Sequence, residues 1–173
     1  MFKSKPLICT AMAFGLLFQS QGVAQAHGNN PHGGQGSTAQ RGSMMQAEQK
    51  PWGIAGDPTK VDRVIRIKMT DDMKFTPNVI SIKKNETIRF EIQNAGKVMH
   101  EMVIGTKQEL DQHAAMMKKH PNMEHDEAYM AHVGPAKSGS IVWRFNKEGD
   151  FDFACLIAGH YDAGMVGKIQ VRP

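Results

Sequence analysis

Cysteine, histidine and methionine follow one another at five-residue intervals near the C-terminal end of the chain. They are Cys155, His160 and Met165, and a further histidine, His100, lies in an earlier strand-like run. One thiolate, two imidazoles and a weak axial thioether are the ligand set of a blue-copper centre. Thiolate and thioether suit Cu(I), and imidazole suits both oxidation states of copper. The residue types therefore predict a copper site that tolerates a one-electron change.

Each of these residues also has a purely structural interpretation. Cys155 would then be a buried inert thiol, His100 a core histidine with satisfied hydrogen bonds, and Met165 a gap filler in the core. The five-residue spacing from Cys to His, or from His to Met, occurs by chance when it is taken alone. Three such residues in one loop, together with a distant histidine, favour the metal site.

Residues 1–26 are typical of a cleaved secretory signal peptide. Two lysines form a positive start, residues 7–18 are largely apolar, and Ala24-Gln25-Ala26 is a small-residue cleavage site. The apolar run is shorter than the ~18 residues that a transmembrane helix needs. We expect export to the periplasm, no membrane span, and His27 as the first residue of the mature chain.

Removal of this leader leaves Cys155 as the only cysteine, because Cys9 lies within the leader. A secreted protein with one cysteine has no intramolecular disulfide, and an exposed free thiol is a liability in an oxidising compartment. Cys155 is therefore expected to be either buried and inert or held by a metal.

From residue 61 onward, apolar and polar residues alternate in short runs that are separated by turn signals such as Lys84-Asn85. A period of two is typical of half-buried strands, and most of the runs have no helical segment between them. A parallel α/β sheet is therefore disfavoured, and we predict an all-β fold, an antiparallel sandwich or barrel. The strand-like segments are residues 65–69, 79–82, 88–92, 98–104, 141–145, 151–153 and 166–171.

Residues 106–134 interrupt this pattern. Good helix formers fill residues 109–119, and Pro121 should end a first helix. Gly134-Pro135 should end a second helix. We therefore predict a helical insert over about 106–134, within a β-domain of residues 60–173.

Several of these segments resemble the cupredoxin family, and the resemblance covers residues 61–173. It rests on Met73–Pro77, Ile88–Phe90, Asn94–Gly96, His100 and the loop from Cys155 to Met165. The resemblance implies a Greek-key β-sandwich that binds one type 1 copper ion. It also implies the ligands: His100, Cys155 and His160 in the equatorial plane, and Met165 in the axial position.

Within that family, the chain is most similar to periplasmic cupredoxins that are induced by copper and linked to copper tolerance, because it carries additional Met and His residues. One position departs from the common pattern. Many cupredoxins have Asn or Ser directly after the first histidine ligand, where it ties the ligand loops together by hydrogen bonds. This chain has Glu101 at that position.

Residues 27–59 are rich in Gly, Asn, Gln, Ser and Pro and are predicted to be a flexible tail. An α-amine beside the imidazole of His27 can chelate copper, and His32, Met44 and Met45 follow in the same segment. The incidental composition of a solvated tail is an equally good interpretation.

The insert holds further candidates for copper binding. On one helix, Met116, Met117 and His120 would share a stripe with His113, because they lie three, four and seven residues after it. Packing of one face on the β-domain explains the methionines, but it explains the histidines less well. A thioether- and imidazole-lined surface that captures Cu(I) explains both. The additional candidates in and near the insert are Met99, Met102, His113, Met116, Met117, His120, Met123, His125, Met130 and His132.

Composition and motifs disfavour several classes of function. The net charge of +4 is modest and the basic residues are scattered, which argues against nucleic-acid binding. The chain shows no phosphate-binding glycine motif and no nucleophile elbow. Its acidic residues, Asp71-Asp72 included, have no paired spacing for general acid/base catalysis. Four protein ligands would also leave copper no open position for a substrate, so an enzyme is disfavoured.

Two functions remain. The first is a periplasmic type 1 copper protein that serves copper tolerance by binding copper ions, additional Cu(I) included, with one-electron redox chemistry. The alternative is an electron-transfer shuttle between periplasmic redox proteins. A monomer is expected in either case.

Overall fold

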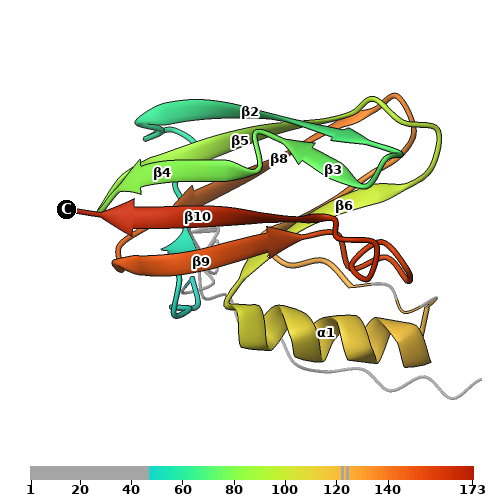
Figure 1. Ribbon diagram of the computed structural model, residues 1–173. Helices are drawn as coiled ribbons and strands as arrows, with labels where there is room; N and C mark the ends of the chain where they lie inside the picture. Colours follow the sequence, from blue (N-terminus) through green and yellow to red (C-terminus); the bar gives the residue numbers. More distant parts are fainter. Residues whose placement is uncertain (1–46, 122, 124) are drawn as a thin grey trace, which may run out of the picture. The chain divides into compact units, whose positions relative to one another are not determined.

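Two β-sheets pack face to face around a hydrophobic core (Figure 1). The computed structural model describes residues 47–121, 123 and 125–173. The predicted signal peptide and residues 27–46 of the predicted tail, with His27, His32, Met44 and Met45, lie outside the described residues. No helix among the described residues is long and apolar enough to cross a membrane.

Ten strands and one helix make up the secondary structure of the described residues. The first sheet has the order β1 (Ile54–Ala55), β8 (Ser138–Arg144), β5 (Thr87–Asn94), β2 (Arg63–Thr70) and β3 (Lys74–Thr76). The second sheet has the order β4 (Val79–Lys83), β10 (Val166–Arg172), β9 (Gly149–Ala154), β6 (His100–Gly105) and β7 (Met130–Val133). The helix, α1 (Lys107–Lys119), packs against the second sheet beside β6 and β9 (Figure 1).

Alternation along the strands builds the core, as the sequence predicts. In β10, Ile169 and Val171 are fully buried, whereas the intervening Gln170 is exposed. Residues of β4 alternate in the same way. Each sheet therefore turns one apolar face toward the other, and the predicted β-sandwich is confirmed.

Two strand pairs are parallel, although the alternation alone had predicted an antiparallel arrangement. β2 pairs with β5, and β4 pairs with β10, in the parallel direction. Between β2 and β5 the chain passes through β3 of the same sheet and β4 of the other sheet. Such a crossover can return a strand in the parallel direction, which a hairpin cannot do. A period of two carries no information about strand direction.

A capping box starts α1. The hydroxyl of Thr106 accepts a hydrogen bond from the Glu109 N–H, and the Glu109 carboxylate accepts one from the Thr106 N–H. The helix ends at Lys119, just before Pro121, as predicted. Its buried residues Leu110, Ala114 and Met117 pack against apolar side chains of the second sheet and the following loop, which are Val103, Met130, Ala154 and Leu156.

The predicted second helix of the insert is wrong. Residues 125–129 form a loop and a turn, and the next four residues form β7, which pairs with β6. The buried residues of β7, Met130 and Val133, are three positions apart, a spacing that is also typical of a helix. The edge of β6 supplies backbone hydrogen bonds to this segment, and this long-range pairing overrides the local pattern.

The predicted boundary between tail and domain lies too late in the sequence. Trp52 is 3% exposed, its ring stacks on Trp143 at a centroid distance of 6.5 Å, and β1 pairs with β8. The folded domain therefore includes residues 50–59, which were assigned to the tail. A single tryptophan among polar residues produces no periodic pattern, so the sequence does not indicate that this segment packs against the domain.

Replacement of Trp52 by Ala should lower the free energy of unfolding by about 3 kcal/mol, because it removes a buried indole and leaves a cavity. Urea denaturation followed by circular dichroism measures this loss. Val64→Ala, which truncates an exposed side chain of β2, is the control and should change the free energy by less than about 0.5 kcal/mol. An unchanged urea midpoint for Trp52→Ala would show that the segment before β1 does not belong to the folded domain.

Candidate metal centre

Three of the predicted ligands converge at one end of the sandwich. His100 begins β6, Cys155 directly follows β9, and His160 lies in the loop between β9 and β10. One ligand atom from each lies within 4.8 Å of the other two. The Cys155 Sγ is 3.2 Å from the Nδ1 of His160, and the two imidazole ring centroids are 5.0 Å apart. This arrangement can hold a metal ion through two nitrogens and one sulfur.

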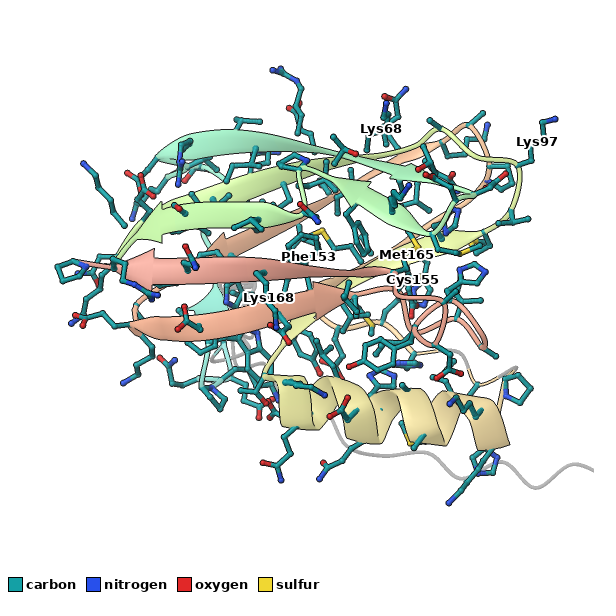
Figure 2. All side chains as sticks on the ribbon, in the orientation of Figure 1. Lys68, Lys97, Phe153, Cys155, Met165 and Lys168 are labelled. Carbon is teal, nitrogen blue, oxygen red and sulfur yellow. The ribbon has the colours of Figure 1, made fainter. Side chains whose placement is uncertain are left out.

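Met165, the fourth predicted ligand, closes the same loop. Its N–H donates to the carbonyl of His160, and its own carbonyl accepts from the Cys155 N–H, both at 3.1 Å. The side chain is fully buried, and Figure 2 shows Cys155 and Met165 beside each other at the ends of β9 and β10. Gly159 and Gly164 adopt positive φ angles that allow the tight turns of this loop.

His100 has one nitrogen with a hydrogen-bond partner and one without. Its Nε2 lies 3.1 Å from a carboxylate oxygen of Asp71, whereas its Nδ1 is buried and has no partner among the described residues. An orphaned buried nitrogen is costly unless something else binds it. A metal ion bound at Nδ1 satisfies that nitrogen, and the carboxylate on Nε2 orients the ring.

Asp71 also fixes the loop that precedes His100. Its carboxylate accepts a hydrogen bond of 2.8 Å from the Lys97 N–H, which lowers the pKa of Asp71, and the contact with His100 lowers it further. Gly96 packs so closely against this carboxylate that a Cβ would collide with it. The Asn94–Gly96 segment, which resembles the cupredoxins, therefore positions the start of β6 and His100.

The Cys155 thiol is buried, and burial raises its pKa to about 12. The Glu101 N–H points at the sulfur from 3.4 Å and lowers the pKa, but by less than burial raises it. Without a cation, the sulfur is therefore a neutral thiol at neutral pH. A bound metal deprotonates a coordinating thiol outright. Burial also lowers the pKa of His160, which keeps its imidazole neutral and able to bind a metal.

Glu101, the departure from the common family pattern, ties the ligand loops together. One carboxylate oxygen accepts a 2.7 Å hydrogen bond from the Leu156 N–H, and the other lies 2.8 Å from the Nε2 of His132. Glu101 is only 2% exposed, and burial raises its pKa. It therefore joins β6 both to the residue after Cys155 and to β7.

Asn94 ties the same region from the first sheet. Its amide Nδ2 donates to the carbonyls of Val98 and Val133, each at 2.8 Å. Its Oδ1 accepts from the Gly96 N–H at 2.8 Å. The side chain thus connects the end of β5, the loop before His100 and β7.

The predicted stripe of His113, Met116, Met117 and His120 does not form one surface, and the other candidates of the insert are scattered as well. Met102 lies in the sandwich core, and Met117 and Met130 pack beneath α1. On the surface lie Met99, Met116, His120 and Met123. By contrast, His113, His125 and His132 approach one another between α1, the following loop and β7.

Sequence reasoning missed two residues that support this centre, Asp71 and His132. Asp71 is one of the acids whose spacing indicates no catalytic pair, yet it contacts His100 from 29 positions away. His132 was considered as a copper ligand but not as the partner of Glu101. No local spacing signals such pairs, because the fold alone brings them together.

Glu101→Ala should destabilise the metal-free protein by about 1–3 kcal/mol, because it leaves the buried Leu156 N–H without its acceptor. Glu101→Gln keeps an oxygen for this N–H and should lose less. Urea unfolding of the two variants and the wild type at pH 7 gives the comparison. If both variants lose stability equally, the hydrogen bond to Leu156 is not what Glu101 contributes.

Comparison with known proteins agrees with this geometry. Residues 61–172 match the family described as copper binding proteins of the plastocyanin/azurin type. The copper-resistant cuproprotein CopI of Rubrivivax gelatinosus is 40% identical over 166 residues, which are 96% of this chain and 94% of that protein. The protein of the same name from Vibrio cholerae is 35% identical over 120 residues, 69% of this chain and 71% of its own length.

Solved structures show the same fold at lower identity. Auracyanin B shares 20% of its sequence with the chain, with a TM-score of 0.57 over 73% of this chain and all of that one. The reduced auracyanin of Roseiflexus castenholzii shares 19%, with a TM-score of 0.56 over 65% of this chain and 99% of its own. With the family match over its β-domain, the chain belongs to the plastocyanin/azurin family of copper binding proteins, the cupredoxins.

Proposed function

We propose that this cupredoxin serves copper tolerance in the periplasm by binding copper through His100, Cys155, His160 and Met165. The observation that carries the proposal is the convergence of a buried thiol, a neutral imidazole and the orphaned Nδ1 of His100 at one point. The copper-resistant cuproproteins of Rubrivivax gelatinosus and Vibrio cholerae, to which the chain is similar, support the assignment to tolerance. The signal-peptide pattern of residues 1–26 supports the location.

Bound copper would supply one-electron redox chemistry. The chain contributes the shape of the site: Asp71 orients His100, the Glu101 N–H faces the sulfur, and the 155–165 loop is closed by backbone hydrogen bonds. These contacts hold the ligand side chains in place, so little rearrangement is expected when bound copper changes its oxidation state. Four ligands from the chain would leave bound copper no open position, and we assign no reaction on a substrate.

Electron transfer is the second candidate function, and the surface around His160 favours it. The small residues Ala158, Gly159, Ala163 and Gly164 are exposed around this half-buried histidine. Val98 and Met99, 43% and 47% exposed, add apolar surface in the loop before His100. A redox partner docked there would approach the copper through the imidazole. Growth of a foreign bacterial host in copper separates the two functions. Such a host lacks the redox partner, so a protein that only carries electrons would not protect it.

Cys155→Ser should abolish the intense visible absorption that sulfur-to-copper charge transfer gives, since a hydroxyl is a harder and less covalent donor. In a copper-sensitive bacterium that exports the full chain, the wild type should restore growth in copper and this variant should not. Val166→Ala, a change at an exposed residue next to Met165, should keep both properties. A coloured Cys155→Ser protein would refute the ligand assignment, and full protection by it would refute the role of this site in tolerance.

Met165→Leu should leave a coloured, folded site with a higher reduction potential, because an axial thioether binds weakly and its loss makes the site drier. Absorption spectroscopy and redox titration measure the two effects. Met69→Leu replaces a fully buried methionine of β2 and should change neither the colour nor the potential. Complete loss of copper from the Met165→Leu protein would show that Met165 is more than a weak axial ligand.

A further inference from the structure

We propose that Asp71, beyond orienting His100, fixes the proton of that imidazole and shifts the copper centre toward Cu(II). This role rests on the proposed function, because it requires His100 to bind copper. Asp71 directly follows β2 of the first sheet, and His100 begins β6 of the second sheet. Their contact therefore joins the two sheets beside the metal centre.

The position of the proton on His100 follows from the chemistry of its partner. At neutral pH a carboxylate is ionised and can only accept hydrogen bonds. The Nε2 of His100 lies 3.1 Å from the Oδ1 of Asp71, so Nε2 carries the proton of the neutral ring. The buried Nδ1, which has no partner among the described residues, then keeps its lone pair. Asp71 thus holds His100 in the neutral form that can bind copper through Nδ1.

Both carboxylate oxygens of Asp71 accept hydrogen bonds, a task that an amide cannot take over. Oδ2 accepts the Lys97 N–H at 2.8 Å, while Oδ1 faces His100. An asparagine side chain has one acceptor oxygen, and its NH2 group only donates. Asp71→Asn would therefore turn a donor either toward the Lys97 N–H or toward the Nε2 of His100. In the second case the ring must move its proton to Nδ1, where it blocks the metal.

The charge of Asp71 acts in the same direction as its hydrogen bond. A carboxylate that accepts the N–H of a metal-binding imidazole makes the ring a stronger donor. A negative charge also attracts Cu(II) more strongly than Cu(I), because the Coulomb energy grows with the charge of the ion. Both effects stabilise the oxidised state and lower the reduction potential. The Asp71 side chain is 39% exposed, so solvent screens part of its charge, whereas the His100 ring is fully buried.

His160, the other imidazole of the centre, lacks such a partner. Among the described residues, the imidazoles within 4 Å of a carboxylate are those of His100 and His132. The Nδ1 of His160 instead faces the Cys155 sulfur at 3.2 Å. Asp71 is therefore placed to act through one ligand of the centre, and its removal changes the surroundings of that ligand alone.

Redox titration of the copper-loaded mature chain tests the shift toward Cu(II). Loss of the carboxylate behind a metal-binding histidine typically lowers metal affinity 10- to 100-fold, and screening places Asp71 at the lower end. Asp71→Asn should lower the affinity for Cu(II) relative to Cu(I) about tenfold, which raises the potential by about 59 mV.

Asp72→Asn is the matched control, because Asp72 carries the same charge but contacts Thr70 and Lys74 on the surface. It should change the potential much less than Asp71→Asn does. An unchanged potential in Asp71→Asn would overturn the proposal. Equal rises in both variants would overturn it as well, because net charge rather than the contact with His100 would then set the potential.

Nitrogen-15 NMR of the metal-free wild-type protein tests the position of the proton without copper. At neutral pH, His100 should show a protonated Nε2 and an unprotonated Nδ1. A proton on Nδ1 would overturn the proposal, and this measurement decides even where Asp71→Asn fails to fold. Neither experiment depends on growth in copper. Failure of the wild type to protect a copper-sensitive host would therefore refute the tolerance function and leave the role of Asp71 standing.

Discussion

The burial of the Cys155 side chain is the constraint on which the rest of the site depends. A thiol with no exposed surface resists ionisation, and its pKa rises to about 12. The Glu101 N–H and the neutral imidazole of His160 lie 3.4 Å and 3.2 Å from the sulfur. Such surroundings suit a neutral thiol in the metal-free protein and a thiolate only when a cation is present. Burial thus protects Cys155 from oxidation and reserves it for a metal.

Three polar side chains convert this buried pocket into a fixed frame. Asn94, Asp71 and Glu101 each bind backbone groups or a histidine from a different loop. Each is supported by hydrogen bonds rather than by apolar packing, so its direction is specified as well as its position. A frame of this kind keeps the ligand atoms in place while the charge on the metal changes. Glu101, at a position where many cupredoxins have Asn or Ser, also extends the frame to His132 of β7.

Much of the copper site could be predicted from sequence, because three of its four candidate ligands lie within eleven residues of one loop. The strands that hold them followed from alternation, which reports one buried face per sheet. The contacts of His100 with Asp71 and of Glu101 with His132 could not be predicted, since they join segments that only the fold brings together. The same reason explains the errors over β7, the parallel strand pairs and the docking of Trp52. In each case a long-range pairing outweighed the local composition.

X-ray absorption at the copper edge, on protein carrying one copper ion in the oxidised and then in the reduced state, is the most direct test of a fixed site. A frame held by backbone and side-chain hydrogen bonds predicts one short sulfur neighbour and two nitrogen neighbours in both states, with bond lengths that change little. Loss of a nitrogen neighbour on reduction, or a first shell without a short copper–sulfur bond, would contradict the assignment of His100, Cys155 and His160 as the ligands of a site that the fold arranges in advance.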